Sequence, residues 1–207
     1  MEFILKHIKV IRCYKAPYFF LSKNLTNEKY YAIMKPELRR KYMRTISIDA
    51  STKSTGIAYF EDTKLIAYDC FTASSNDLIK RIQKITGGIN EFLNKYPADK
   101  IILEEVRPEN GLQNIQTHRA LMWLQAAIAF VLHENHPKTK IEYVYPSQWR
   151  AACGIKNGRG IRRDSQKAGD IKFVKETYGI DVNDDIADAI GIGHAYVNEL
   201  DNEMNWE

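Results

Sequence analysis

The stretch TISIDASTKSTGIAYF, residues 45–60, decides the fold. Residues 45–49 alternate and are rich in β-branched side chains, which predicts a strand that ends on an acid, Asp49. A run of small residues then turns the chain into a second predicted strand at 57–60. A further turn precedes a third predicted strand at 65–71, so we expect the three strands to form an antiparallel meander.

The hydrophobic pattern downstream alternates between helical and strand spacing. The predicted elements are a helix at 75–96, a strand at 100–106, a long helix at 112–133, a strand at 141–145, and helices at 147–153, 164–178 and 184–199. This order predicts one α/β domain with a mixed sheet, in which the first and fourth strands lie side by side at the centre.

Residues 1–43 differ from residues 44–207 in charge and composition. They hold ten Lys and Arg against three acids, net +7, whereas residues 44–207 hold twenty against twenty-three, net −3. The extension is rich in aromatic residues and shows no regular period. We expect the folded domain to span 44–207. Two interpretations of the extension stay open: a basic aromatic arm that touches nucleic acid, or a poorly ordered segment before a natural start at Met43.

Bulk features favour a cytoplasmic protein with no membrane partner. Cys13, Cys70 and Cys153 are widely spaced and indicate neither a disulfide framework nor a zinc site. No apolar run reaches the roughly 20 residues that span a bilayer. The apolar residues at the N-terminus are interrupted by Lys6 and Lys9, which is not typical of a signal peptide.

Several carboxylates occur where burial makes them costly. Asp49 ends the first strand, and Glu104 and Glu105 lie inside the apolar fourth strand. Neighbours on a strand point to opposite faces, so only one of these two Glu residues can join a given site. Asp185 and Asp188 are three apart on the last predicted helix and therefore share a face.

Acids on two central strands and one helix favour a site for a hard cation. Mg²⁺ prefers oxygen ligands, and two such ions about 4 Å apart can activate a water and stabilise the leaving oxygen of a phosphodiester. Mn²⁺ is a possible substitute. The alternatives are structural: Asp49 could simply close its strand, and Asp185 could complement the helix dipole.

In this order, the acids and their flanking residues resemble the RuvC-type Holliday junction resolvases of the ribonuclease-H-like superfamily. Residues 46–56 look like the family's opening strand and turn, Leu103-Glu104-Glu105-Val106 looks like its second acidic motif, and residues 185–189 look like its closing helix. The segment 145–150, with the basic helix after it, is similar to phage-encoded members. The resemblance covers 44–198 and implies a ribonuclease-H-like, mixed five-stranded sheet flanked by helices. The catalytic residues and ligands of two Mg²⁺ ions that it implies are Asp49, Glu104, Asp185 and Asp188.

The resemblance also implies a crossover junction endodeoxyribonuclease, active in DNA recombination and repair. Such an enzyme would resolve Holliday junctions or other branched DNA by two-metal phosphodiester hydrolysis, in a bacterium or a phage-infected host cell. It implies a homodimer through the 112–133 helix, which would place two sites on one four-way junction. Burial of this helix within the monomer is the alternative. Two other functions stay open: a nuclease acting on RNA–DNA hybrids or flaps, and a non-catalytic nucleic-acid-binding protein.

Basic residues are expected to hold the DNA backbone. Residues 150–175 contain eight Lys and Arg against two Asp, and glycines interrupt the first half. A cationic loop next to an acidic site suits phosphates, and a solvated charged face is the alternative. The predicted DNA-binding residues are Lys53, Arg107, Arg150, Lys156, Arg159, Arg162, Arg163 and Lys167.

Two residues in this region leave their roles open. Arg107 stands where cellular resolvases carry an aromatic residue, three positions beyond Glu104. A cation can bind phosphate or stack on a base but is not an apolar wedge. Trp149 either stacks on a base or belongs to the core.

Overall fold

The structure is a computed structural model that describes residues 42–106, 115–156 and 161–200. The chain divides into two units between Lys41 and Tyr42, and all described residues belong to the second unit. Of residues 1–43, the structure describes only residues 42 and 43. Both interpretations of this segment, as a basic arm or as a poorly ordered extension, therefore stay predictions.

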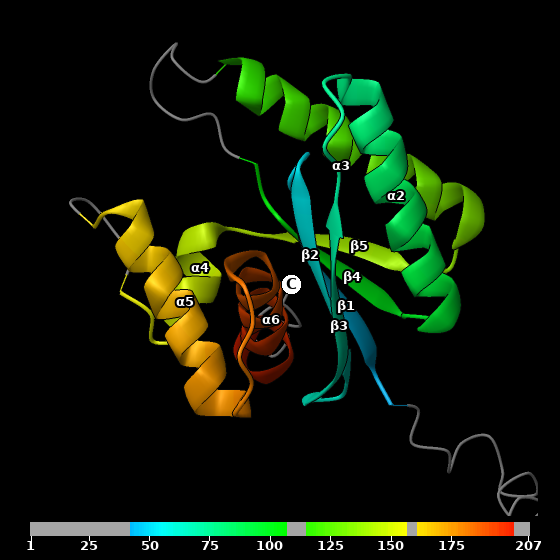
Figure 1. Cartoon of the computed structure of the whole chain (residues 1–207). Helices are drawn as coiled ribbons and strands as arrows, with labels where there is room; N and C mark the ends of the chain where they lie inside the picture. Colours follow the sequence, from blue (N-terminus) through cyan, green and yellow to red (C-terminus); the bar gives the residue numbers. More distant parts are fainter. Residues whose placement is uncertain (1–41, 107–114, 157–160, 201–207) are drawn as a thin grey trace, which may run out of the picture. The chain divides into compact units, whose positions relative to one another are not determined.

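Five strands form one mixed sheet in the order β3-β2-β1-β4-β5 (Figure 1). β1 (Arg44–Asp49), β2 (Ser54–Glu61) and β3 (Lys64–Thr72) make the predicted antiparallel meander. β4 (Lys100–Glu104) pairs in parallel with β1, and β5 (Lys140–Val144) pairs in parallel with β4. The predicted α/β class, the mixed five-stranded sheet and the central pairing of the first and fourth strands are confirmed.

Helices cover both faces of the sheet. They are α2 (Leu78–Lys95), α3 (Ile115–Asn135), α4 (Pro146–Ala152), α5 (Arg163–Tyr178) and α6 (Asp184–Ala195), followed by the π-helical turn η3 (Tyr196–Leu200). Figure 1 shows α2 and α3 on one face, and α6 with α4 and α5 on the other. The predicted last helix was expected to reach residue 199, but its α-helical part ends at Ala195. In the described part of the chain, every helix is too short or too polar to cross a bilayer.

The alternation of side chains along the strands divides the interior into two sides. Ile46 and Ile48 of β1 pack against α2 and α3, together with Ile101 and Leu103 of β4. Ile102, between the last two, packs on the opposite side with residues of α4 and α6. Because alternate residues share a face, Asp49 and Glu104 belong to the α6 side.

Glycine lets α6 lie unusually close to the sheet. A Cβ on Gly56 of β2 would lie only 1.9 Å from the backbone oxygen of Asp185. A Cβ on Gly193 would lie 2.2 Å from the Phe60 ring. Between these contacts, Ser47 Oγ donates a 2.6 Å hydrogen bond to the carbonyl of Ala189. These contacts fix α6 against β1 and β2 along most of its length, from Asp185 to Gly193.

Candidate active site

The backbone brings the four predicted acids to one edge of the sheet. Ile48 pairs with Leu103 in parallel register, so the residues that follow them, Asp49 and Glu104, lie at the same carboxyl edge. Asp49 pairs with Gly56, and Gly56 is the residue against which the Asp185 backbone packs.

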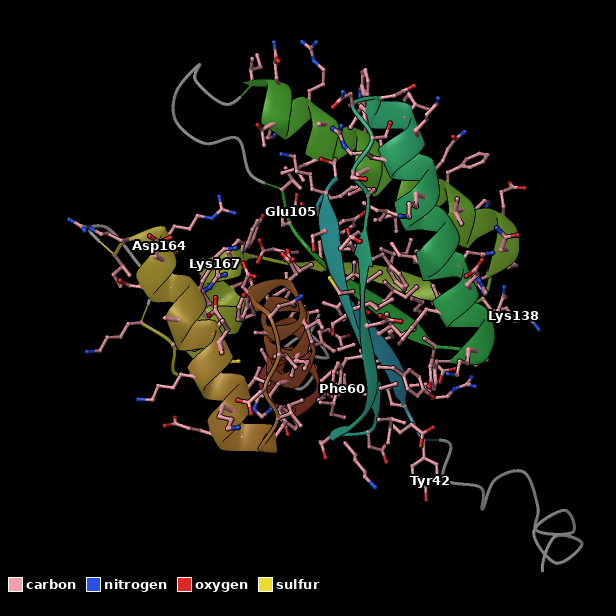
Figure 2. The ribbon with its side chains drawn as sticks, in the orientation of Figure 1. Tyr42, Phe60, Glu105, Lys138, Asp164 and Lys167 are labelled. Atoms are coloured by element: carbon pink, nitrogen blue, oxygen red, sulfur yellow. The ribbon has the colours of Figure 1, made fainter. Side chains whose placement is uncertain are left out.

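A residue next to Glu104 and a lysine of the basic helix α5 lie at this end of the molecule. Figure 2 shows Glu105, directly after β4, and Lys167 of α5 at the same end of the molecule, whereas Tyr42, before β1, lies at the opposite end. The structure therefore places the four acids together with a basic segment, while their catalytic and ligand roles stay predictions.

The acids share one electrostatic environment. Although part of Asp49 stays accessible, burial raises the pKa of its carboxyl to about 8, with further contributions from the negative charges of Glu104 and Asp185. Burial, the charge of Asp49, and a hydrogen bond with Asp170 together with its charge raise the pKa of Asp188 to about 9. The pKa of Glu104 is raised by burial, which a hydrogen bond from Trp149 opposes. Such shifts are typical of carboxylates that are crowded together with little water.

Three neutral side chains donate hydrogen bonds to the acidic residues. Trp149 Nε1 donates to Glu104 Oε2 at 2.7 Å. Gln125 of α3 donates to the backbone carbonyl of Glu104 at 2.6 Å, and Ser54 Oγ donates to Asp185 Oδ2. Trp149 is fully buried, so of its two predicted roles the structure supports the core and leaves no ring face for a base.

Arg150 lies inside the acid cluster and not on an open surface. Its Nη2 contacts Asp170 Oδ2 at 3.2 Å and Asp188 Oδ2 at 3.5 Å, and its side chain is only 12% exposed. Arg150 was predicted to contact DNA, but here its guanidinium faces carboxylates. Asp170, whose side chain has no exposed surface, was not predicted to be part of the site. One signal for it was available: an acid four residues before Val174 on the buried side of an otherwise basic helix.

The donor set suits a hard cation, although the side chains do not form a closed coordination shell. In the described part of the chain, no three His, Cys, Asp or Glu side chains are grouped closely enough to hold a metal ion. However, Asp188 Oδ1 is buried and receives no hydrogen bond from a nitrogen donor, and the Asp188 carboxyl hydrogen-bonds instead with the acid Asp170. A buried carboxylate oxygen without a donor, next to other repelling carboxylates, is the environment that a divalent cation would stabilise. The residues therefore fit Mg²⁺ chemically.

The predicted DNA-binding residues occupy different positions. Lys53, Lys156, Arg162 and Arg163 are exposed. Lys167 is half-buried and forms an ion pair with Asp184. The charges of Lys167 and Arg163 reach the cluster, since they lower the pKa of Asp49 and of Glu104 respectively, against the larger effect of burial.

Arg107 and Arg159 lie outside the described residues. Their assignment as DNA contacts stays a prediction, as does the consequence of a cation at position 107.

Comparison with known proteins supports the fold. No family model matches the sequence, and no curated protein is similar enough to match. RuvC of Thermus thermophilus in complex with a Holliday junction substrate superposes with a TM-score of 0.60 at 16% identity, over 74% of this chain and 92% of that chain. A second structure of T. thermophilus RuvC gives a TM-score of 0.58 at 16% identity, over 79% and 97%. The yeast mitochondrial Holliday junction resolvase Ydc2 gives 0.52 at 14% identity, over 80% and 82%. The chain therefore has the fold of the RuvC-type Holliday junction resolvases, as its sequence resemblance predicted.

Proposed function

We propose that this chain is a Mg²⁺-dependent endonuclease that cleaves Holliday junctions or other branched DNA. One observation carries the proposal. Carboxylates from β1, β4 and α6 share one crowded environment at the carboxyl edge of the sheet, next to a basic segment, in the fold of junction resolvases. Perturbed carboxylates at such an edge are typical of catalytic sites.

In the proposed mechanism, Asp49, Glu104, Asp185 and Asp188 hold the metal. When bound, Mg²⁺ would supply Lewis acidity for attack of water on a phosphodiester and for stabilisation of the leaving oxygen. The chain itself controls the charge of its ligands. With pKa values of about 8 and about 9, Asp49 and Asp188 carry protons at neutral pH. They must release these protons to act as ligands, so metal binding is coupled to proton release.

Exposed cations next to the acids suit the phosphate backbone. Lys53 lies in the turn between β1 and β2, four residues after Asp49 and directly before β2. Arg162 and Arg163 are exposed at the start of α5. Contacts of this kind position the backbone and do not read the sequence. We propose that these three residues hold the DNA, so that the scissile phosphate approaches the acids.

We also propose that two copies associate through α3. Its exposed apolar residues recur seven or eight positions apart: Ile115, Met122, Trp123 and Phe130. Trp123 is 51% exposed and Phe130 is 67% exposed. Large apolar side chains grouped on a surface mark interaction sites. Phe130→Glu is expected to convert a dimer into a monomer in sedimentation analysis. A dimer that persists in this variant would contradict the use of α3.

Cleavage of defined substrates tests the proposed activity. We expect Mg²⁺-dependent nicks in a synthetic four-way junction, and loss of these nicks in Asp185→Asn. Asp164→Asn, which changes an exposed acid on α5, is the matched control and should keep activity. Cleavage of an RNA–DNA hybrid or a flap, without cleavage of the junction, would favour the alternative nuclease. Junction binding with no cleavage in any variant would favour a non-catalytic binding protein.

A further inference from the structure

Two adjacent residues of α4 contact two different acids of the cluster. Trp149 donates to Glu104 of β4 at 2.7 Å, and Arg150 contacts Asp188 of α6 at 3.5 Å. The seven-residue helix α4 therefore links a carboxylate on the sheet to a carboxylate on the helix that covers it.

The Trp149 side chain is held firmly in place. It has no exposed surface, and a Cβ on Gly191 of α6 would lie 2.6 Å from its ring, which shows how closely the two packed elements meet. The Arg150 guanidinium lies over the same ring, 4.2 Å from the ring centroid. An indole that cannot move fixes the direction of its N–H group, and so fixes the Glu104 carboxylate that accepts from it.

Asp170 determines how strongly Arg150 binds Asp188. Both Nε and Nη2 of Arg150 bond to the Asp170 carboxylate, at 3.2–3.4 Å. Only Nη2 reaches Asp188, at 3.5 Å, through Oδ2. Asp188 Oδ1 is buried and receives no hydrogen bond from a nitrogen donor, while the Asp188 carboxyl also hydrogen-bonds with that of Asp170. Asp170 thus takes up most of the hydrogen-bonding capacity of Arg150 and contacts Asp188 itself.

We propose that α4 positions the acids for cation binding. Trp149 orients Glu104, and Arg150, restrained by Asp170, orients Asp188. Trp149, Arg150 and Asp170 are positioning residues, since they act through the acids. The inference rests on the proposed function, because the orientation of the acids matters only if they hold a metal ion.

Direct Mn²⁺ binding by titration calorimetry on the full chain tests the role of Trp149. Trp149→Phe keeps an aromatic ring and removes the donor, and is expected to raise the Kd for Mn²⁺ about tenfold, as the loss of an outer hydrogen bond to a metal ligand usually does. Tyr196→Phe is the matched control. It removes a buried donor to Glu142, outside the acid cluster, and should leave the Kd unchanged. An unchanged Kd in a folded Trp149→Phe chain would overturn the role of Trp149.

A double-mutant cycle tests Arg150 and Asp170 and does not depend on Trp149→Phe folding. Asp170→Asn releases Arg150 toward Asp188 and is expected to raise the Mn²⁺ Kd about tenfold. In Asp170→Asn/Arg150→Gln, the Kd should be little higher than in Asp170→Asn alone, because both residues act on the same carboxyl, that of Asp188. Two independent losses would add instead. Effects that simply add would overturn the role of the pair.

Activity provides a second readout with a distinct signature. In Asp170→Asn, the Mg²⁺ concentration for half-maximal cleavage should rise about tenfold, while the rate at saturating Mg²⁺ recovers. A lower rate at every Mg²⁺ concentration with no shift in half-saturation would count against positioning.

Failure of the inference and failure of the proposed function can be separated. Both are overturned if the wild-type chain binds no Mn²⁺, or if the Asp49→Asn variant binds Mn²⁺ as tightly as the wild type. Mn²⁺ binding that weakens in Asp49→Asn but is unchanged in Trp149→Phe and Asp170→Asn overturns only the inference.

Discussion

On the α2–α3 side of the sheet, the central strands bury only apolar side chains, among them Ile46, Ile48 and Leu103. On the α6 side, the same strands contribute Ser47, Asp49 and Glu104. Both sides are tightly packed, but they hold the fold together differently. The first depends on the hydrophobic effect, whereas the second depends on hydrogen bonds and charges that are costly to bury. A single alternating strand can therefore supply a stabilising face and a chemical face at once.

The largest effect should come from removing an acid on the α6 side. Asp188→Asn is expected to reduce junction cleavage by at least about 100-fold, since even outer contacts of a metal ligand are worth 10–100-fold. Stability should hardly fall, because the Asp188 carboxyl, with a pKa of about 9, is already neutral at pH 7. Cleavage rates and thermal unfolding, measured on the same preparation, check this separation. A variant that unfolds readily would show that the acid has a structural role.

The opposite face should give the reverse result. Ile48→Ala removes a fully buried side chain between β1 and the α2–α3 core. We expect a loss of about 2–5 kcal/mol in the free energy of unfolding, with cleavage retained in the fraction that stays folded. Chemical denaturation measures the loss. Ile66→Ala, at an exposed position on β3, is the control and should change little. A loss of cleavage in folded Ile48→Ala chains would break the division between the two faces.

Without metal, the α6 side should make stability depend on pH. The pKa values of Asp49 and Asp188 are raised to about 8 and about 9, so the folded chain binds protons that the unfolded chain releases near pH 4. The free energy of unfolding should therefore fall as pH rises from about 4 to about 9, by at most about 1.4 kcal/mol per pH unit for each group.

Metal should act in the opposite direction. Mg²⁺ should restore the lost stability at high pH, and cleavage should increase over the same range. Thermal unfolding at pH 6 and pH 9, with and without Mg²⁺, measures both effects. A flat pH profile in the metal-free chain would contradict the crowding of the acids.

The smallest effect is expected at the exposed cations. Arg162→Gln should weaken junction binding a few-fold and reduce the dependence of the Kd on salt by about one phosphate contact. The cleavage rate at saturating DNA should stay unchanged, because Arg162 contacts none of the four acids. Binding measured at several salt concentrations checks this expectation. Lys138→Gln, an exposed lysine on the α2–α3 side (Figure 2), is the control.

Much of the fold could be predicted because each element has its own local signal. The β-branched alternation before Asp49 and the helical spacing after Leu78 do not depend on distant residues. The order of the acids then identified the family's fold, and the parallel pairing of β1 with β4 explains why they meet.

The contacts around the acids could not be predicted in the same way, since they join residues far apart in the chain. Trp149 lies 45 residues from the carboxylate it binds, and Ser54 lies 131 residues from Asp185. The enclosure of Arg150 among acids could not be predicted for a related reason. A run of charges in a sequence suggests a solvated face, and only the packing of α4, α5 and α6 shows that one of these cations is enclosed.

The close contact at Gly56 also has a consequence for the order of assembly on the ribosome. The strands that carry Asp49 and Glu104 emerge long before residues 184–195, which must dock against Gly56 to bring the other two acids. Until that docking, the nascent sheet displays Ala58 and Phe60 with no helix over them, a surface that invites aggregation or chaperone binding. The four acids come together only at this late step, so the candidate site is assembled after most of the sheet has been synthesised.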